Sequence, residues 1–472
     1  MTRRSLDSAI LAIDLGTSSV RTALFDARAR PVSGSSASQV YRVRHTVAHG
    51  AEVDPAVLLR ATRKCLRQTL SLTTTAPRAV AGSGFWHSLL GLDRAGEPLT
   101  PIYTWADARG AEDAARLRGE LDEREIQQRT GCMLRASFWP AKLRWLRRTE
   151  PKLFRRVARW VSPTEWIFEK IWATRACSHS MASGTGLYNF AYRDWDDELL
   201  ATSCLTRAKV GVLHDRMDQD ESIIFPAIGD GAASNLGSDA SAPGVVAINV
   251  GTSAAVRAVL TAEAPLPFGL FRFVVDQKRS LLGGAVSNAG NLHAWCRREL
   301  RLPNDERALE KILRQPRPGA EHLTVLPFWA SERAPTWPEH LDGVILGLTH
   351  ASTAADVLRA TTTAVSYRLA DILELLEGTI GRAKRIIVSG GILKSPAALQ
   401  ILADSLGRDF EVCDEPEASL RGAAVHALEL LGHRIAAPRF QCHIRHHPAK
   451  SRRAREQRAR QKALEALFSS WI

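Results

Sequence analysis

The fold is indicated by two similar stretches, ILAIDLGTSSVRTAL at Ile10–Leu24 and VVAINVGTSAAVRAV at Val245–Val259. Each begins as an apolar run typical of a buried strand, passes through a Gly-Thr-Ser turn and resumes as a second β-rich run. This pattern predicts a β-hairpin with a tip of small residues, and the hairpin occurs twice. The copies are far too distant for a solenoid repeat, so they indicate two domains of related fold that face one another.

Further strands and helices follow each predicted hairpin. Ala79–Gly84 is a strand pattern that ends in glycines, and Arg385–Gly391 is a buried strand that runs into a glycine turn. Apolar residues recur at helical spacing from Thr353 to Leu376, and a second helix is predicted from about Ser395 to Leu406. Strands that alternate with helices predict the α/β class.

The length predicts more than one domain, because a chain of 472 residues is too long for a single ordinary core. The short stretch Ser241–Gly244 has the composition of a linker. We therefore expect an N-terminal domain at residues 1–243, a C-terminal domain at 244–440 and a basic tail at 441–472.

Composition narrows the class of protein. Hydrophobic residues make up 45% and charged residues 24%, as in soluble globular proteins. The seven cysteines are scattered without a CxxC pair, which favours a reducing compartment over a disulfide framework. No apolar stretch is long enough to span a bilayer. We expect a cytoplasmic protein with no membrane partner.

The net charge of +13 is concentrated near the C-terminus. Residues 450–462 hold seven Lys or Arg and one Glu, which leaves +7 on the rest of the chain, a value ordinary for an enzyme that binds anions. No zinc-finger or RNP-type motif accompanies the tail, so a nucleic-acid partner is not expected. A charged terminal helix is the simplest interpretation, with contact to RNA or acidic lipids as the alternative.

The two Gly-Thr-Ser turns suit phosphate binding. Gly16, Thr17 and Ser18, and likewise Gly251–Ser253, offer backbone N–H groups and hydroxyls without bulky side chains. Asp14, just before the first turn, can hold Mg²⁺ directly or through water. One such turn is common in any β protein. Two copies, the first preceded by an acid, favour a phosphate site.

Asp230 is the candidate general base. It lies between two glycines in IGDGAASNLG, at Ile228–Gly237, where an apolar run ends. A carboxylate in that position can project into a cleft and accept the proton of an attacking hydroxyl, as phosphoryl transfer to an alcohol requires. The alternative is an ordinary turn or helix N-cap aspartate.

These residues carry a resemblance to the FGGY carbohydrate kinases, a branch of the actin-like ATPase superfamily, from about Ile10 to about Leu431. The motifs that resemble those of the family are Asp14–Arg21 for the first phosphate motif, Asn249–Ser253 for the second, Ser389–Gly391 with Ser395 for the nucleotide-base motif, Glu417–Ala424 for the helix after it, and the short element Glu332–Pro335. The resemblance implies two actin-like, ribonuclease-H-like domains with a cleft between them for ATP and substrate.

Within the family, the chain resembles gluconate kinases in three stretches, His87–Asp93, Thr104–Arg109 and Asp230–Gly237. It lacks the Arg-Glu and Gln-Gln pairs of glycerol kinases. The resemblance implies a transferase that phosphorylates gluconate to 6-phosphogluconate, with ATP and Mg²⁺ as cofactors.

The resemblance also implies roles for individual residues. Asp230 is the catalytic base, Asp14 is the metal residue, and Trp86, His87, Trp105 and Asp107 approach the acceptor. The residues implied to bind ATP are Gly16, Thr17, Ser18, Arg21, Gly251, Thr252, Ser253, Gly390, Gly391 and Ser395.

Departures from the family pattern leave alternatives open. Phe85 and Trp86 stand where relatives usually have Gln-Met, and Cys177–Met181 stands where they usually have an Asp. A kinase for xylulose, or for another pentulose or polyol, is the alternative within the family. A non-catalytic ATP-binding sugar sensor is the alternative of another class. A homodimer is possible in either case.

Two further stretches have simple interpretations. Cys442, His443, His446 and His447 have metal-ligand residue types, but their spacing fits no closed zinc site, and we expect them at the surface. The stretch Arg144–Arg159 has apolar residues near helical spacing and predicts one amphipathic helix with a basic, solvated face.

Overall fold

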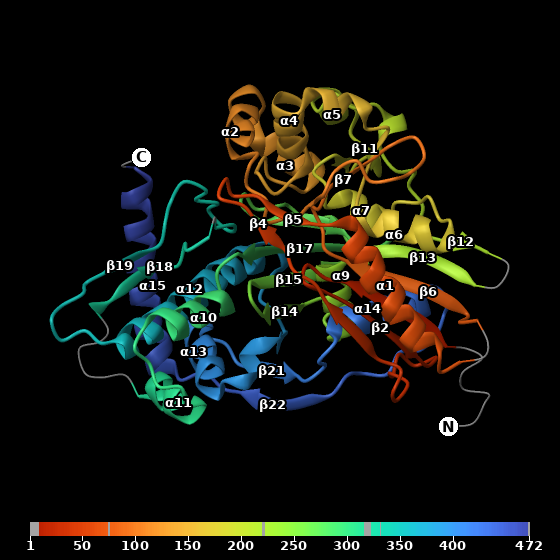
Figure 1. Ribbon diagram of the computed structural model, residues 1–472. Coiled ribbons are helices and arrows are strands. Elements are labelled where there is room, and N and C mark those ends of the chain that lie inside the picture. The colour runs from red at the N-terminus through yellow and green to blue at the C-terminus, as the bar shows by residue number, and fades with distance from the viewer. Residues whose placement is uncertain (1–8, 74–75, 220–221, 316–321, 331, 471–472) are drawn as a thin grey trace.

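The chain folds around two mixed β-sheets that lie side by side (Figure 1). The computed structural model describes residues 9–73, 76–219, 222–315, 322–330 and 332–470. None of the helices in these ranges is both long enough and apolar enough to cross a membrane.

The first sheet is built around the first hairpin. Its six strands lie in the order β12-β13-β6-β1-β2-β3. Their bounds are β1 Ile10–Leu15, β2 Ser19–Phe25, β3 Ala37–Val40, β6 Ala79–Gly84, β12 Met217–Asp218 and β13 Ile223–Gly229. β1 pairs antiparallel with β2 and parallel with β6, and all six of its residues are buried, as the apolar run predicts. The strand predicted at Ala79–Gly84 is confirmed as β6.

The second sheet repeats this arrangement. Its seven strands lie in the order β16-β17-β15-β14-β20-β21-β22. Their bounds are β14 Val245–Val250, β15 Ala254–Leu260, β16 Phe271–Val274, β17 Ser280–Val286, β20 Arg385–Ser389, β21 Phe410–Cys413 and β22 Phe440–Ile444. The run β17-β15-β14-β20-β21 matches β3-β2-β1-β6-β13 in strand order and in strand direction. The predicted internal repeat is therefore confirmed.

Helices cover the sheets. α1 (Pro55–Leu70) follows the first hairpin, and α12 (Ala354–Ile380) is its longer counterpart in the second half. α12 begins at a capping box in which the Thr353 and Asp356 side chains bond each other's backbone N–H groups, a strong local start signal. α10 (Gly290–Glu299), α11 (Glu306–Arg314) and α13 (Pro396–Leu406) pack beside it.

A group of short elements is inserted between β6 and β13. The helices are α2 Ala111–Glu120, α3 Glu123–Thr130, α4 Trp139–Thr149, α5 Pro151–Arg156, α6 Pro163–Trp172, α7 His179–Ser183, α8 Asp197–Thr202 and the 3-10 turn Arg207–Lys209. The short strands among them are β7 Leu90–Leu92, β8 Ile102–Tyr103, β9 Arg159–Val161, β10 Tyr188–Asn189 and β11 Asp194–Trp195. Two more short strands, β4 Arg44–His45 and β5 Ala51–Val53, precede α1, and β5 pairs with both β4 and β8. α2–α5 form a cap at the top of Figure 1.

The prediction of one helix over Arg144–Arg159 is wrong. α4 ends at Thr149, α5 begins at Pro151, and β9 begins at Arg159. Proline has no backbone N–H and disfavours helical geometry in the residue before it, so Pro151 ends one helix and starts the next.

Two helices from different halves join the sheets. α9 (Asp230–Gly237) follows β13, and α14 (Ala418–Leu430) follows β21, yet α14 packs against β1 and β6 of the first sheet as well as against α9. The two helices approach so closely that a Cβ on Gly422 would lie 1.7 Å from the Ala233 carbonyl oxygen, and one on Gly237 would lie 1.8 Å from that of Ala418. Only glycine permits this contact.

The C-terminal segment packs onto the second unit. β22 is the edge strand of the second sheet, and α15 (Pro448–Ser469) lies along α12 and α13. The buried Arg368 of α12 pairs with Glu465 of α15 at 2.7 Å. The remaining strands, β18 (Thr324–Leu326) and β19 (Val344–Leu346), form a two-stranded sheet beside α15.

Candidate active site

The end of β1 places a buried carboxylate beside the first Gly-Thr-Ser turn. Asp14 is 4% exposed, and the parallel register of β1 and β6 sets it opposite Ser83, whose hydroxyl donates to the Asp14 carboxylate. Burial raises the pKa of Asp14 to about 6, helped by the nearby Asp230 and Glu417 and opposed by Ser83 and Arg21. The turn itself closes with a hydrogen bond from the Gly16 N–H to the Ser19 carbonyl at 3.0 Å.

Arg21 connects the first hairpin to the second half of the chain. The hairpin register sets it opposite Asp14, and its Nη1 lies 3.6 Å from Asp14 Oδ2 and 3.1 Å from Glu417 Oε2. Glu417 immediately precedes α14. The first Gly-Thr-Ser turn is therefore held to an element of the other domain through one guanidinium.

Asp230 lies at the junction of β13 and α9. It is the first residue of α9, with Gly229 at the N-cap position, and its Oδ1 accepts the Gly231 N–H at 2.7 Å. Burial raises the pKa of its carboxyl group, while the positive charges of Arg257 and Arg333 oppose the rise. The carboxyl group is thus half-buried and faces two cations, and its role as the general base stays a prediction.

Arg257, on β15, is the cation that lies against the segment carrying Asp230. A Cβ on Gly231 would lie 3.0 Å from the Arg257 Nε, so the guanidinium packs tightly against this backbone. Within the described residues this buried Nε has no hydrogen-bond partner. A buried donor without a partner is costly, so this N–H is a candidate for contact with a bound ligand.

Trp86 packs against the backbone that leads to Asp230. It is 5% exposed, its Nε1 donates to the Ser180 carbonyl at 2.9 Å, and a Cβ on Gly229 would lie 1.7 Å from its ring. The indole therefore supports the end of β13. Its contact with an acceptor stays a prediction.

His87 is held neutral beside Trp86. Its Nδ1 donates to the Gly184 carbonyl, which leaves Nε2 as an acceptor, and its ring centroid lies 4.7 Å from that of Phe138. Burial lowers the pKa of the imidazole to about 3. Its backbone is left-handed, with φ of 65°, an uncommon conformation for a residue with a side chain.

Trp105 contacts residues from both halves of the chain. Its Nε1 donates to the Thr17 hydroxyl at 3.0 Å, and the Arg333 guanidinium lies 4.8 Å from its ring centroid. Arg333 is fixed in turn by Ser287, whose hydroxyl accepts from its Nε at 3.1 Å. Trp105, which is predicted to approach the sugar substrate, thus contacts the first Gly-Thr-Ser turn and the short Glu332–Pro335 element.

The Asp107 side chain is buried and makes its hydrogen bonds within the N-terminal domain. It is 1% exposed; its Oδ2 accepts the Ala51 N–H at 3.0 Å, and the Arg109 Nε lies 3.1 Å from Oδ1. Both carboxylate oxygens are engaged within the domain. A direct contact with the acceptor therefore stays a prediction.

The second turn opens onto the larger cavity of the C-terminal domain. The cavity is about 950 Å³ and lies between α10, α12 and α13, with Gly251, Thr252, Gly391 and Ser395 in its lining. The start of α10 holds this turn, because the Gly290 N–H donates to the Gly251 carbonyl at 2.9 Å. This volume is within the roughly 300–1,000 Å³ range of small-molecule sites.

The glycine turn after β20 brings the backbone close to the same cavity. Gly390 has φ of 98°, and a Cβ there would lie 2.6 Å from the Val250 carbonyl oxygen. Ser395 caps α13 by accepting the Ala398 N–H at 3.1 Å and also donates to Glu310 of α11. The structure therefore separates the predicted ATP residues into two groups, one on the first hairpin and one that combines the second hairpin with the turn between β20 and α13.

Sequence reasoning missed several charged residues of the site. Arg257 follows the second turn, and Arg333 lies in a stretch singled out only as a family motif. Lys142 on α4 is 1% exposed and donates to the Ala136 carbonyl at 3.1 Å, and burial lowers its pKa to about 7. A lysine within an apolar helix face is the one local signal that could have found it.

The fold places the chain among two-domain sugar kinases. A solved xylulose kinase from Lactobacillus acidophilus matches with a TM-score of 0.90, and a gluconate kinase from the same organism with 0.89; each covers 98% of both chains at 23% identity. Residues 9–251 match the N-terminal domain of the FGGY family of carbohydrate kinases, and residues 246–429 match its C-terminal domain. The chain belongs to the FGGY family of carbohydrate kinases.

Curated relatives fall into more than one substrate class. The gluconokinase of Bacillus subtilis is 28% identical over 90% of this chain and 88% of its own length. The xylulose kinase of Streptomyces coelicolor is 29% identical over 89% and 88%. The chain is thus a carbohydrate kinase of a family that uses ATP as phosphate donor.

Proposed function

We propose that the chain transfers the γ-phosphate of ATP to gluconate and releases 6-phosphogluconate. The observation that carries this proposal is the pair of cations at Asp230. Arg257 and Arg333 both act on the carboxyl group of the candidate base, and Arg257 keeps a buried N–H without a partner among the described residues. An acceptor with its own carboxylate suits such a site, since guanidinium groups pair with carboxylates in a fixed geometry. The similarity to gluconokinases supports the same acceptor.

In this proposal the protein binds and orients both substrates. The Gly16–Ser18 and Gly251–Ser253 turns hold the phosphates of ATP, and the cavity beside Gly391 and Ser395 holds its base. Asp230 accepts the proton of the attacking hydroxyl, and closure of the two domains keeps water from the transferred phosphoryl group. We place the reaction in the cytoplasm, in keeping with seven unpaired cysteines.

The residues at the first turn fit Mg²⁺. Among the described residues no three His, Cys, Asp or Glu side chains cluster into an all-protein metal site. Asp14, with Asp230 and Glu417 near enough to act on its charge, offers the small carboxylate set that Mg²⁺ uses when phosphates and water complete its shell. When bound there, Mg²⁺ would offset the negative charge of the phosphates.

The base is tested by Asp230→Asn. A general base typically contributes ~10²–10⁴-fold, so kcat should fall by about that factor while the affinity for ATP changes little. Asp218→Asn, an exposed carboxylate on β12 of the same sheet, is the matched control and should keep full activity. Full activity in Asp230→Asn would remove this residue from the mechanism.

The acceptor is tested by kcat/KM for gluconate and for xylulose with the same preparation. A higher kcat/KM for xylulose would assign the chain to the pentulose kinases instead, which the similarity to xylulose kinases supports as the second candidate. Binding of ATP without phosphorylation of any sugar, polyol or sugar acid would favour a sensor.

A further inference from the structure

One ion pair joins the first Gly-Thr-Ser turn to the second half of the chain. Arg21 of β2 lies with its Nη1 3.1 Å from Oε2 of Glu417, the residue before α14. Each of these two side chains is 39% exposed, so a ligand can reach the pair. Ion pairs with this exposure contribute little to stability, and either partner can exchange for a stronger one. We call this contact the interdomain ion pair.

The residues that follow Glu417 touch the segment that carries the candidate base. Ala418 begins α14, and its carbonyl oxygen would lie 1.8 Å from a Cβ placed on Gly237 of α9. The Ser419 hydroxyl donates to the carbonyl oxygen of Asp230, the first residue of α9, at 3.4 Å. The position of Glu417 is therefore connected to that of Asp230 through the first two residues of α14.

We propose that Glu417 is a positioning residue that holds Arg21 until the γ-phosphate of ATP takes its place. The inference depends on the proposed placement of ATP, with its base in the cavity beside Gly391, and not on which sugar is phosphorylated. Asp14 lies close enough to Asp230 for the two charges to interact, so the first turn lies beside the proposed base. The γ-phosphate, which is attacked at that base, must then approach Arg21.

A terminal phosphate is a stronger partner for a guanidinium than a carboxylate is. It carries more negative charge than one carboxylate, presents three oxygens and pairs with arginine in a bidentate geometry. Arg21 therefore moves from Glu417 to the γ-phosphate, which releases the start of α14 beside Asp230 only when that phosphate is present. After transfer, Glu417 competes for Arg21 with the phosphate of the product and so favours release of the product.

This competition lowers the affinity for ATP but not the affinity for ADP. A nucleotide with a γ-phosphate must break the interdomain ion pair before it binds Arg21, whereas ADP lacks that phosphate and leaves the pair intact. The strength of a partly exposed ion pair corresponds to about a 2- to 5-fold change in affinity. Removing the Glu417 carboxylate should therefore strengthen ATP binding, which is the opposite of what the loss of a ligand contact would do.

The test is calorimetric titration of the full-length protein at saturating Mg²⁺ with ADP and with the non-hydrolysable ATP analogue AMP-PNP. We expect Glu417→Gln to strengthen analogue binding by about 2- to 5-fold and to leave ADP binding unchanged. Arg21→Gln should weaken analogue binding by about 10- to 100-fold, and adding Glu417→Gln to it should have no further effect. Glu429→Gln is the matched control: this carboxylate at the other end of α14 pairs with Arg279 at 2.7 Å, and the variant should bind both nucleotides as the wild type does.

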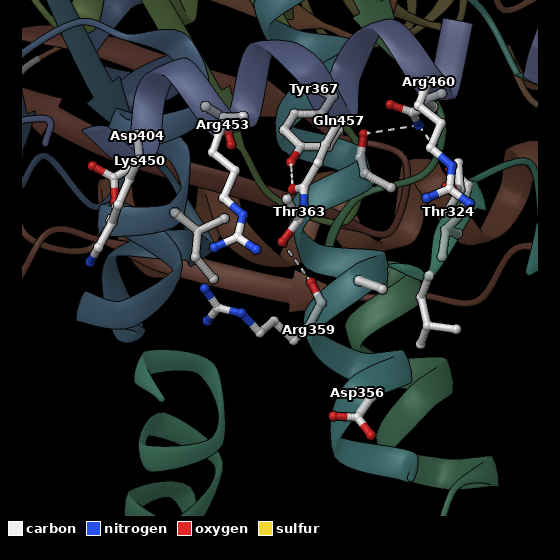
Figure 2. Close-up of a pocket in the computed structure, with 18 of the residues that line it drawn as sticks. Thr324, Asp356, Arg359, Thr363, Tyr367, Asp404, Lys450, Arg453, Gln457 and Arg460 are labelled. Carbon is white, nitrogen blue, oxygen red and sulfur yellow. Dashed lines mark hydrogen bonds and ion pairs between the residues drawn. The ribbon is translucent and has the colours of Figure 1, made fainter. Parts of the chain in front are cut away.

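A second control lies away from the two Gly-Thr-Ser turns. The Tyr367 hydroxyl of α12 donates to Gln457 of α15 at 2.6 Å, and both residues line a pocket between these helices (Figure 2). Tyr367→Phe removes this contact within the C-terminal domain and should leave both nucleotide affinities at the wild-type values. A change equal to that of Glu417→Gln would show a general response of the domain and would overturn the proposal.

Three further results would overturn the proposal. Unchanged analogue binding in Glu417→Gln, together with the expected loss in Arg21→Gln, would refute the competition and leave the proposed placement of ATP intact. Equal strengthening of analogue and ADP binding would show that the lost negative charge acts on all the phosphates, without an exchange at Arg21. Unchanged binding in both variants would show that no phosphate reaches the first turn, so the proposed placement of ATP would fail as well. Thermal midpoints check that each variant folds.

Discussion

The crossing of α9 and α14 makes a strong prediction about Gly422→Ala. The added Cβ would lie 1.7 Å from the Ala233 carbonyl oxygen and 2.4 Å from its carbon. Non-bonded heavy atoms rest at about 3.5–4.0 Å, so the two helices would have to separate by on the order of 2 Å. The obstacle is backbone, which cannot rotate away as a side chain can. We therefore expect a cost near the upper end of the ~1–3 kcal/mol typical of overpacking.

The assay compares thermal midpoints and turnover with those of the wild type. A loss of ~3 kcal/mol corresponds to a midpoint lower by about 5–10 °C. Turnover should also fall, because α9 begins at Asp230 and α14 follows Glu417. Gly378→Ala is the matched control: this exposed glycine of α12 has no atom near its Cβ position, so the same change should stabilise by about 0.5–1 kcal/mol. A Gly422→Ala protein with the wild-type midpoint and turnover would refute this account of the domain junction.

Three further predictions concern charged groups. Asp14 has a pKa of about 6 in the folded state against an ordinary 3.8. Between about pH 4 and pH 6 the folded protein therefore retains a proton that the unfolded chain has lost, and the free energy of unfolding falls as pH rises through that interval. Asp14→Asn should raise the free energy of unfolding by up to ~3 kcal/mol at pH 7.5, and urea midpoints should show this gain shrinking toward pH 4. Glu465→Ala leaves Arg368 buried without its carboxylate, and should lower stability by about 3–5 kcal/mol in urea titrations, whereas an unchanged midpoint would show that the pair contributes nothing. Arg257→Gln removes a charge that lowers the pKa of Asp230, so the acidic limb of the kcat/KM profile should move to higher pH; an unmoved limb would separate Arg257 from the base.

Local sequence signals predicted the repeated core well. The predictions of the two hairpins, of β6 and of the long helix α12 depended on the spacing of apolar residues and on turn residues within short stretches. The capping box at Thr353 marks where α12 begins. Asp14, Gly16 and Gly251 were singled out for the same reason, because the turns beside them are local features of the sequence; their roles stay predictions.

Contacts between distant parts of the chain could not be predicted in this way. Arg21 pairs with Glu417, and Arg333 lies over Trp105, but nothing near any of these residues signals its partner. The packing of α14 from the second half onto the first sheet is likewise a tertiary contact, and its only mark in the sequence is a small residue, Gly422. The terminal helix predicted for the basic tail is confirmed as α15, but its sequence did not show that it packs onto α12 and α13.

The position of α15 gives the C-terminal segment a physical connection to the active site. Arg368 of α12 pairs with Glu465 on α15 and donates from Nη2 to the Ala334 carbonyl at 3.0 Å. Ala334 follows Arg333, whose guanidinium lies over Trp105, and Trp105 donates to Thr17 of the first Gly-Thr-Ser turn. Each of these contacts fixes the next, and buried charges tolerate little displacement. Loss of α15 would therefore leave Arg368 without its carboxylate partner and loosen one support of the Glu332–Pro335 element, so the segment whose residues 450–462 carry +6 of the net charge of +13 also supports the geometry around Asp230.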